Sequence, residues 1–168
     1  MATDPNLPET APEETAKQRT NRELIELLNE LRVALPGVQV MFAFLLAVPL
    51  STRFPEIGDN ERAIFYVTLS STAIATALLI APSAIHRIDF RNEDKASMIL
   101  LFNKLAIAGL FFTAWSMIGA LTFIAALLYA TSVAAIVFTL STATFSLLWF
   151  YLPIRRRMKR PDDPRRPD

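Results

Sequence analysis

The chain has 168 residues with 16 acidic and 17 basic side chains, a formal net charge of +1, and 52% apolar residues, a high apolar fraction for a soluble domain. It contains no cysteine and a single histidine, which excludes disulfides, thiolate metal sites and histidine-rich metal sites. We expect no metal, no cofactor and no nucleic-acid partner.

Charged side chains are segregated along the chain. They are absent from three long stretches, which are bounded by Arg32 and Arg53, by Arg62 and His86, and by Lys104 and Arg155. A charge in the middle of a membrane costs roughly 2.5 to 3.5 kcal/mol on insertion scales, so the ends of membrane spans hold the charges. The sequence therefore predicts an integral membrane protein built from helices.

The N-terminal region divides into a tail and a helix. Residues 1–19 combine three prolines with four acidic side chains, a composition that buries too little apolar area to fold, and are predicted to be disordered. Residues 20–32 begin with a capping-box spacing and are predicted to form an amphipathic helix. Its apolar stripe is Leu24, Leu27, Leu28 and Leu31. Because the polar face is acidic, two placements stay open, the membrane surface or the protein's own helices.

Two spans are predicted in the first half of the chain. Val33–Leu50 is an uncharged run of 18 residues, close to the length that crosses a hydrocarbon core of roughly 30 Å. Pro36 removes a helix hydrogen bond, which predicts a bend where the amphipathic helix becomes this span. The second span is Ala63–Ile85, and the loop before it offers Asp59 or Asn60 as an N-cap.

Two further spans are predicted in the second half. The 50 residues from Leu105 to Ile154 carry no charge, too many for one crossing and about right for two. We place the third span at Leu105–Ala126 and the fourth at Val133–Leu152, joined by a tight turn. Residues 161–168 are predicted to be a second disordered tail. The membrane domain, residues 20–160, is thus predicted to be all-α, with four transmembrane helices preceded by a short amphipathic helix.

Basic residues near the span ends predict the orientation. Fifteen Lys and Arg residues lie in the N-terminal region, the second loop and the C-terminal region, against Arg53 and Arg62 in the first loop and none in the third. Cytoplasmic loops carry the excess of Lys and Arg, so both termini are predicted to be cytoplasmic. We expect a multi-pass protein of a bacterial plasma membrane, with the lipid bilayer as its first partner.

The predicted spans offer little chemistry. They contain no carboxylate, which a proton or sodium carrier normally needs inside the membrane. The loops lack a glycine-rich phosphate loop, a nucleophile elbow and paired acidic motifs, so no catalytic site is expected. Trp115 is interpreted as a packing anchor. Small residues form stripes that favour close helix packing, namely Ser71 with Ala75, Ser116 with Ala120, and Ala135 with Thr139 and Ala143.

One group of polar residues is predicted to converge at the cytoplasmic rim, because the helix ends that carry them meet at one membrane face. Its members are Glu30, Arg32, Gln39, His86, Arg87 and Lys104. Two interpretations stay open: ordinary interfacial anchors, or a functional cluster that senses pH through His86, since histidine changes charge near physiological pH. If Lys104 is drawn into the headgroup region, Glu30 is its expected ion-pair partner.

Three segments resemble a family of small actinobacterial four-span membrane proteins of unknown function. They are ELLNELRVALPGVQVMFAFLL at Glu26–Leu46, APSAIHR at Ala81–Arg87, and WFYLPIRRR from Trp149. The similarity runs from about Arg22 to Lys159, implies the four-helix topology, and draws attention to the residues of those segments, namely Glu30, Arg32, Gly37, Gln39, His86 and Arg87. Some members carry an automatic label of sodium/proton antiporter. The resemblance implies no mechanism, and the carboxylate-free spans give that label no support.

The sequence favours a small non-enzymatic bundle that acts as a structural, sensory or accessory component of the membrane. The competing class is a small cation or proton transporter or channel subunit. With four spans, such a subunit would need to form an oligomer to enclose a pathway. Under either interpretation, the partners to look for are another protein or a second copy of the chain.

The orientation can be tested with single cysteines, because the natural chain has none. Cysteines placed at Gly58 and Thr131 are expected to react with an impermeant thiol reagent added outside cells. Cysteines placed at Ala96 and Asp163 are expected to react only after the membrane is permeabilised. The reverse labelling pattern would invert the predicted orientation.

Overall fold

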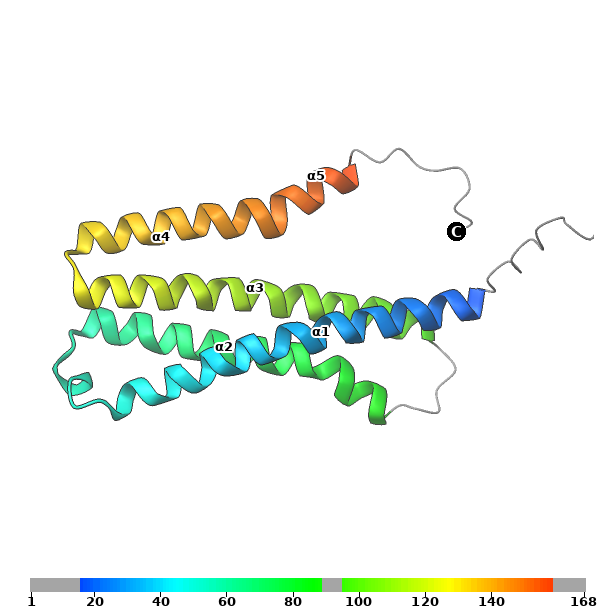
Figure 1. The fold of residues 1–168 in the computed structure, drawn as a ribbon, viewed down its shortest axis with the longest axis horizontal. Coiled ribbons are helices and arrows are strands. Elements are labelled where there is room, and N and C mark those ends of the chain that lie inside the picture. The colour runs from blue at the N-terminus through cyan, green and yellow to red at the C-terminus, as the bar shows by residue number, and fades with distance from the viewer. Residues whose placement is uncertain (1–15, 89–94, 159–168) are drawn as a thin grey trace, which may run out of the picture.

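The computed structural model describes residues 16–88 and 95–158, and these residues form helices, turns and no strand. Four segments are long and apolar enough to cross a membrane, namely Leu24–Leu50, Asp59–Ile88, Ser97–Leu128 and Thr131–Arg156. Each long helix runs antiparallel to the next along the chain (Figure 1). The prediction of an all-α protein with four potential transmembrane helices is therefore confirmed.

The first helix, α1, is longer than predicted. It runs without interruption over Ala16–Ala47 and is followed by a short 3-10 turn, η1 (Val48–Leu50). It thus joins the amphipathic segment to the first span. Residues 16–19, assigned to the disordered tail, are helical because Ala, Lys, Gln and Arg all favour a helix. Residues 1–15 of that tail lie outside the described residues.

Pro36 does not interrupt α1, and the reason is a continuous buried stripe. Side chains at seven-residue intervals on either side of Pro36 are only 3% to 7% exposed: Leu24, Leu31, Val38 and Leu45. Such a repeat keeps one face of a helix against its neighbours. Pro36 and Gly37 are themselves exposed, so the hydrogen bond that proline removes lies away from the core.

The second helix, α2 (Asp59–Ile88), begins slightly earlier than the sequence suggests. The carbonyl of Gly58 accepts a hydrogen bond from the backbone N–H of Arg62 at 3.0 Å, so the N-cap position falls on Gly58. Neither Asp59 nor Asn60 takes that role. Asp59 instead lies in the first turn of α2, where a negative charge is favoured by the helix dipole.

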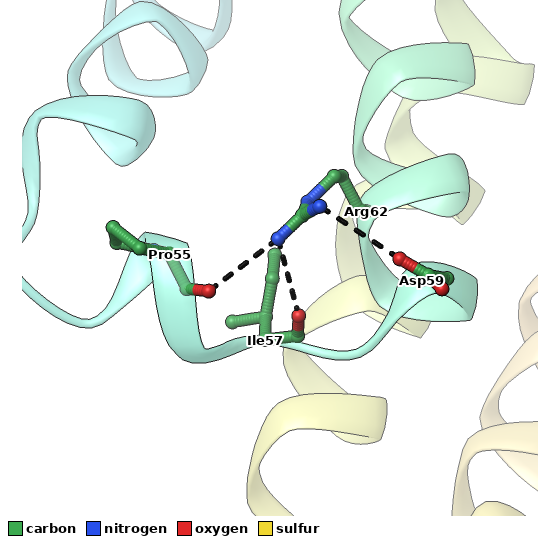
Figure 2. Close-up of polar contacts among 4 residues, drawn as sticks. All are labelled: Pro55, Ile57, Asp59 and Arg62. Atoms are coloured by element: carbon green, nitrogen blue, oxygen red, sulfur yellow. Dashed lines mark hydrogen bonds and ion pairs between the residues drawn. The ribbon is translucent and has the colours of Figure 1, made fainter.

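The loop between α1 and α2 is closed by Arg62 (Figure 2). This loop contains the 3-10 turn η2 (Phe54–Glu56). The Arg62 guanidinium donates from Nη2 to the carbonyl oxygens of Pro55 at 3.4 Å and Ile57 at 3.5 Å, and its Nη1 lies 3.7 Å from Oδ1 of Asp59. Its charge and donors are thus used in holding the loop together.

A short turn joins the last two spans. α3 (Lys95–Leu128) and α4 (Thr131–Phe145) are separated only by Tyr129 and Ala130, within the stretch where the turn was expected. No glycine or proline is needed because the chain keeps local hydrogen bonds through the turn. The backbone N–H of Tyr129 donates to the carbonyl of Ala125 at 2.9 Å.

The fourth span does not end as a plain α-helix. α4 passes into a π-helical turn, η3 (Ser146–Tyr151), and then into α5 (Leu152–Met158). A π-helical turn holds one more residue than an α-helical turn, so the side chains after it point in a different direction. The predicted tail at 161–168 lies outside the described residues.

The packing is centred on α2 and α3. The apolar windows of these two spans are 33% and 39% buried, whereas those of the first and fourth spans are 11% and 6% buried. Within the described residues, α1 contacts both central helices, and α4 contacts α3 but neither α1 nor α2. The protein is a three-helix core with a peripheral fourth span.

The two ends of the bundle differ in character. One end holds the start of α1, the end of α2, the start of α3, and α5 (Figure 1). We call it the basic end, after the exposed side chains of Arg87, Lys104, Arg155 and Arg156. The other end, with the α1–α2 loop and the α3–α4 turn, we call the loop end.

Candidate functional site

The residues predicted to form a rim cluster are mostly exposed on the surface of the bundle. The exposed side chains are those of Glu30, Arg32, Gln39, Arg87 and Lys104, and His86 is half-buried. Gln39 lies farther from the basic end than the others, well inside α1. Among the described residues, no ion pair joins Glu30 to Lys104. The fold thus brings the helix ends together without the expected ion pair.

The direction of Lys104 explains the missing ion pair. Ala106 of α3 packs against the core cluster that includes Leu31 of α1. Successive residues of an α-helix are about 100° apart, which puts Lys104 roughly 200° from Ala106, on the far side of α3. That side faces the fourth span, as shown by Phe111, two turns further on, whose ring lies 6.1 Å from that of Phe150. Lys104 therefore points away from α1 and from Glu30.

His86 has a different environment from the other rim residues. It follows Phe65, Thr72 and Leu79 at seven-residue intervals, and these three are 0% exposed. His86 thus extends the buried face of α2 by two turns and reaches the basic end, where it is half-buried. The imidazole belongs to the packing face of α2.

The polar site that the fold does assemble lies in the middle of the bundle. Ser116 of α3 is completely buried, and its hydroxyl is hydrogen-bonded to the hydroxyl of Thr72 in α2. Its Oγ also lies 3.2 Å from the carbonyl oxygen of Thr68 and 3.9 Å from the sulfur of Met41 in α1. Ser116 thus contacts all three core helices. We call Met41, Thr68, Thr72 and Ser116 the hydroxyl layer.

The hydroxyl layer separates two apolar clusters. Towards the basic end the core contains Leu31, Val38, Ala75 and Leu79, and towards the loop end it contains Leu45, Phe65 and Phe123. The Phe65 and Phe123 rings lie 5.5 Å apart, so the loop-end cluster joins α2 to α3 through aromatic contact. A polar layer between two dry layers fixes the register of the helices.

Other hydroxyls of the core are satisfied within their own helices. Each donates to the carbonyl four residues earlier at 2.7 to 2.8 Å, as seen for Thr68, Ser71, Thr72, Thr76, Thr113 and Thr122. This is the usual local hydrogen bond of Ser and Thr in helices, and it satisfies the hydroxyl donor in apolar surroundings. Among the core hydroxyls, those of Thr72 and Ser116 also link one helix to another, because they are hydrogen-bonded to each other between α2 and α3.

Two glycines of α3 allow α2 to come close. A Cβ atom added at Gly119 would lie 2.2 Å from Oγ1 of Thr68, and one added at Gly109 would lie 2.6 Å from Cδ2 of Leu79. No side chain fits at Gly119 unless α2 moves, because Thr68 is buried and β-branched. Gly109, Ser116 and Phe123 follow one another at seven-residue intervals. They therefore lie on one face of α3, the face that packs against α2.

The hydroxyl layer has no chemistry of its own beyond packing. It contains no titratable group, and its hydroxyls are hydrogen-bonded to each other or to the backbone carbonyls of Ile64 and Thr68. Within the described ranges, no three His, Asp or Glu side chains are placed to hold a metal ion. What this layer can do is align three helices in an apolar solvent.

Part of the hydroxyl layer and its surroundings was predicted from the sequence. The small-residue stripes found Ser71, Ala75 and Ser116, all of which are buried. The third stripe, Ala135, Thr139 and Ala143, is instead exposed on α4. Trp115 packs against Phe138 with ring centroids 6.4 Å apart and anchors α4 to α3. The packing roles of Met41 and Gly119 could not be predicted from the neighbouring sequence, because they depend on which helix lies opposite each residue.

The fold and its interior define a polytopic α-helical bundle whose four long helices are apolar enough to cross a membrane. The chain belongs to a family of unknown function, DUF6328, whose family model matches residues 13–153. No curated protein and no solved structure matches it.

The close approach at Gly119 gives a direct test of this packing. Gly119→Ala is expected to destabilise the bundle by about 1 to 3 kcal/mol, because the new methyl group overlaps the rigid Thr68 side chain. Gly37→Ala is the matched control: nothing lies within 4 Å of a Cβ added there, and alanine favours a helix. Thermal unfolding in detergent, followed by tryptophan fluorescence, measures both.

A second variant separates the overlap from a general effect of the substitution. Adding Thr68→Ala to Gly119→Ala removes the atom that the new methyl group meets, so the double variant is expected to be more stable than the sum of the two single effects predicts. Simple additivity, or equal effects at Gly119 and Gly37, would contradict the close approach of α2 and α3.

Proposed function

We propose that this protein is a non-enzymatic structural or accessory component of a bacterial plasma membrane, with both termini in the cytoplasm. The main support is the closed interior of the three-helix core. Its polar groups are hydroxyls bonded inside the layer described above, and no carboxylate lies within the core clusters. Such an interior has neither an ion-binding group nor a reactive group to offer.

The fourth span supports an accessory role, because it is the incomplete part of the bundle. It contacts only α3 among the long helices, and most of its surface is exposed. It also holds Thr142, whose Oγ1 is the one buried side-chain oxygen or nitrogen without a hydrogen-bond partner among the described residues. A span with an exposed small-residue face is suited to packing against another transmembrane helix.

A second candidate is a cation or proton transporter or channel subunit that works as an oligomer. It is favoured by one observation: the hydroxyl-bearing side chains of Ser132, Thr139, Thr144 and Ser146 in the fourth span are exposed. Copies arranged around these faces would line a pathway with hydroxyls. Against it, the acidic residues within the four spans, namely Glu26, Glu30, Asp59 and Glu61, all lie near span ends, so no carboxylate lies mid-span where a coupled carrier could bind and release an ion.

Flux measurements in proteoliposomes decide between these two functions. With an internal pH-sensitive dye and an imposed sodium or proton gradient, we expect the same dye response from proteoliposomes and empty liposomes. A reference sodium/proton antiporter, reconstituted in parallel, shows that the assay responds. Sodium-dependent proton movement that increases with the amount of protein would refute the accessory role and favour the oligomeric carrier.

A further inference from the structure

Gln39 is a polar side chain on the outer surface of the first span. It follows Val38, which is 3% exposed, yet its own side chain is exposed, and among the described residues it has no hydrogen-bond partner. The span runs over Leu24–Leu50, so its middle residue is Gly37, and Gln39 lies about 3 Å beyond it. An amide exposed to hydrocarbon at that depth has no water to bond, and it is costly unless another molecule covers it.

The exposed face of α1 lies opposite its buried stripe. Successive residues are about 100° apart, so Pro36, Val40 and Ala47 lie roughly 160 to 180° round the helix from Val38, and all three are exposed. α1 contacts α2 and α3 but not α4, so no other described helix covers this face. Nothing lies within 4 Å of a Cβ atom added at Gly37, so the backbone is open there. We call the face centred on Pro36, Val40 and Ala47 the outer face of α1.

The two flanks of the outer face carry unlike groups at matching heights. Arg32 lies roughly 60° to one side of its centre, whereas Glu26 and Glu30 lie roughly 60° and 100° to the other side, and all three are exposed. Glu30 is about 3 Å from Arg32 along the helix axis. Among the described residues neither Arg32 nor Glu30 makes an ion pair. In mid-span, Gln39 lies about 80° to the side of Arg32 and Gly37 about 80° to the other.

Two copies of the chain in one membrane bring such flanks together. Copies inserted with the same orientation have parallel first spans, and a two-fold axis along the membrane normal relates them. In a parallel helix pair, each flank of one contact face meets the opposite flank of the other, as e and g positions do in a coiled coil. Arg32 of each copy then faces Glu30 of the other. Gln39 of each copy faces the open backbone at Gly37 of the other.

We propose that the outer face of α1 is an interface between two copies of this chain in the membrane. The Gln39 amide donates to a backbone carbonyl beside Gly37 of the second copy, and Arg32 pairs with Glu30 of the second copy. Charge complementarity favours this occupant, because a lipid chain offers no acceptor to the amide and no carboxylate to the arginine. The proposal rests on the membrane location of the protein and not on its accessory role. A positive flux result would therefore change the function and leave this interface in place.

Association in liposomes tests the role of Gln39. Copies that carry a donor or an acceptor dye on Thr52→Cys, in the exposed first loop, are reconstituted together, and energy transfer is followed as lipid is added. We expect the saturable transfer of a dimer. Gln39→Leu is expected to weaken the association about tenfold, because it removes two symmetry-related hydrogen bonds between helices. Asn103→Leu is the matched control: it removes an exposed amide from α3 and is expected to leave the association unchanged.

A charge exchange tests the flanks in the same assay. Arg32→Glu is expected to weaken the association, because like charges then face each other, and Arg32→Glu combined with Glu30→Arg is expected to restore it. Thermal unfolding of each variant at high dilution checks that the bundle itself is intact. Transfer no greater than that of random mixing, equal effects of Gln39→Leu and Asn103→Leu, or no restoration by the exchange would overturn the proposal.

A cysteine at the centre of the outer face locates the contact. Mild oxidation in the native membrane is expected to link copies that carry Val40→Cys, since the chain has no other cysteine and Val40 is 56% exposed. Copies that carry Leu140→Cys, at a residue of α4 that is 63% exposed, are expected to stay unlinked. Linking through Leu140→Cys alone would move the contact to the fourth span. A Val40→Cys product with a mass other than that of two chains would indicate a different protein, and either result overturns the proposal.

Discussion

The close contact of α2 with α3 is the interaction on which the rest of the structure depends. In a bilayer the lipid is as apolar as the helices, so close packing and hydrogen bonds must supply the association that water supplies in soluble proteins. Gly109 and Gly119 remove the side chains that would hold the helices apart, and Ser116 bonds across the gap that remains. α1 packs against this pair through Met41 and through its stripe of buried side chains. α4 packs against another face of α3.

Hydropathy and charge were sufficient to predict the number of spans and the fold class, because both follow from the cost of placing charge in lipid. The separate amphipathic helix was not found, since Leu31 and Val38 continue one buried stripe past Pro36 and packing outweighs one lost hydrogen bond. The ion pair expected between Glu30 and Lys104 is absent among the described residues for a related reason. Sequence indicates which helix ends meet, but the direction of Lys104 depends on which faces of α3 are taken by α1, α2 and α4.

The same geometry accounts for where interactions with other molecules are expected. The three-helix core satisfies its own hydroxyls, and Arg62 uses its donors on the carbonyls of the first loop. The fourth span is the exception: it has one neighbour, an unpartnered Thr142 hydroxyl, and a π-helical turn after which it leaves α3. The proposed accessory role rests on that incomplete side and requires no chemistry in the core.

The most direct measurement is a disulfide between α2 and α3 in the native membrane. The chain has no cysteine, so Thr72→Cys combined with Ser116→Cys places the only two thiols where two hydroxyls are in hydrogen-bond contact. Mild oxidation is expected to link them fully, seen as a reducible shift in electrophoretic mobility. Thr139→Cys with Ser116→Cys is expected to stay unlinked, because Ser116 faces α2 and α4 lies on the other side of α3. Linking in the second pair but not in the first would contradict the packing on which this account rests.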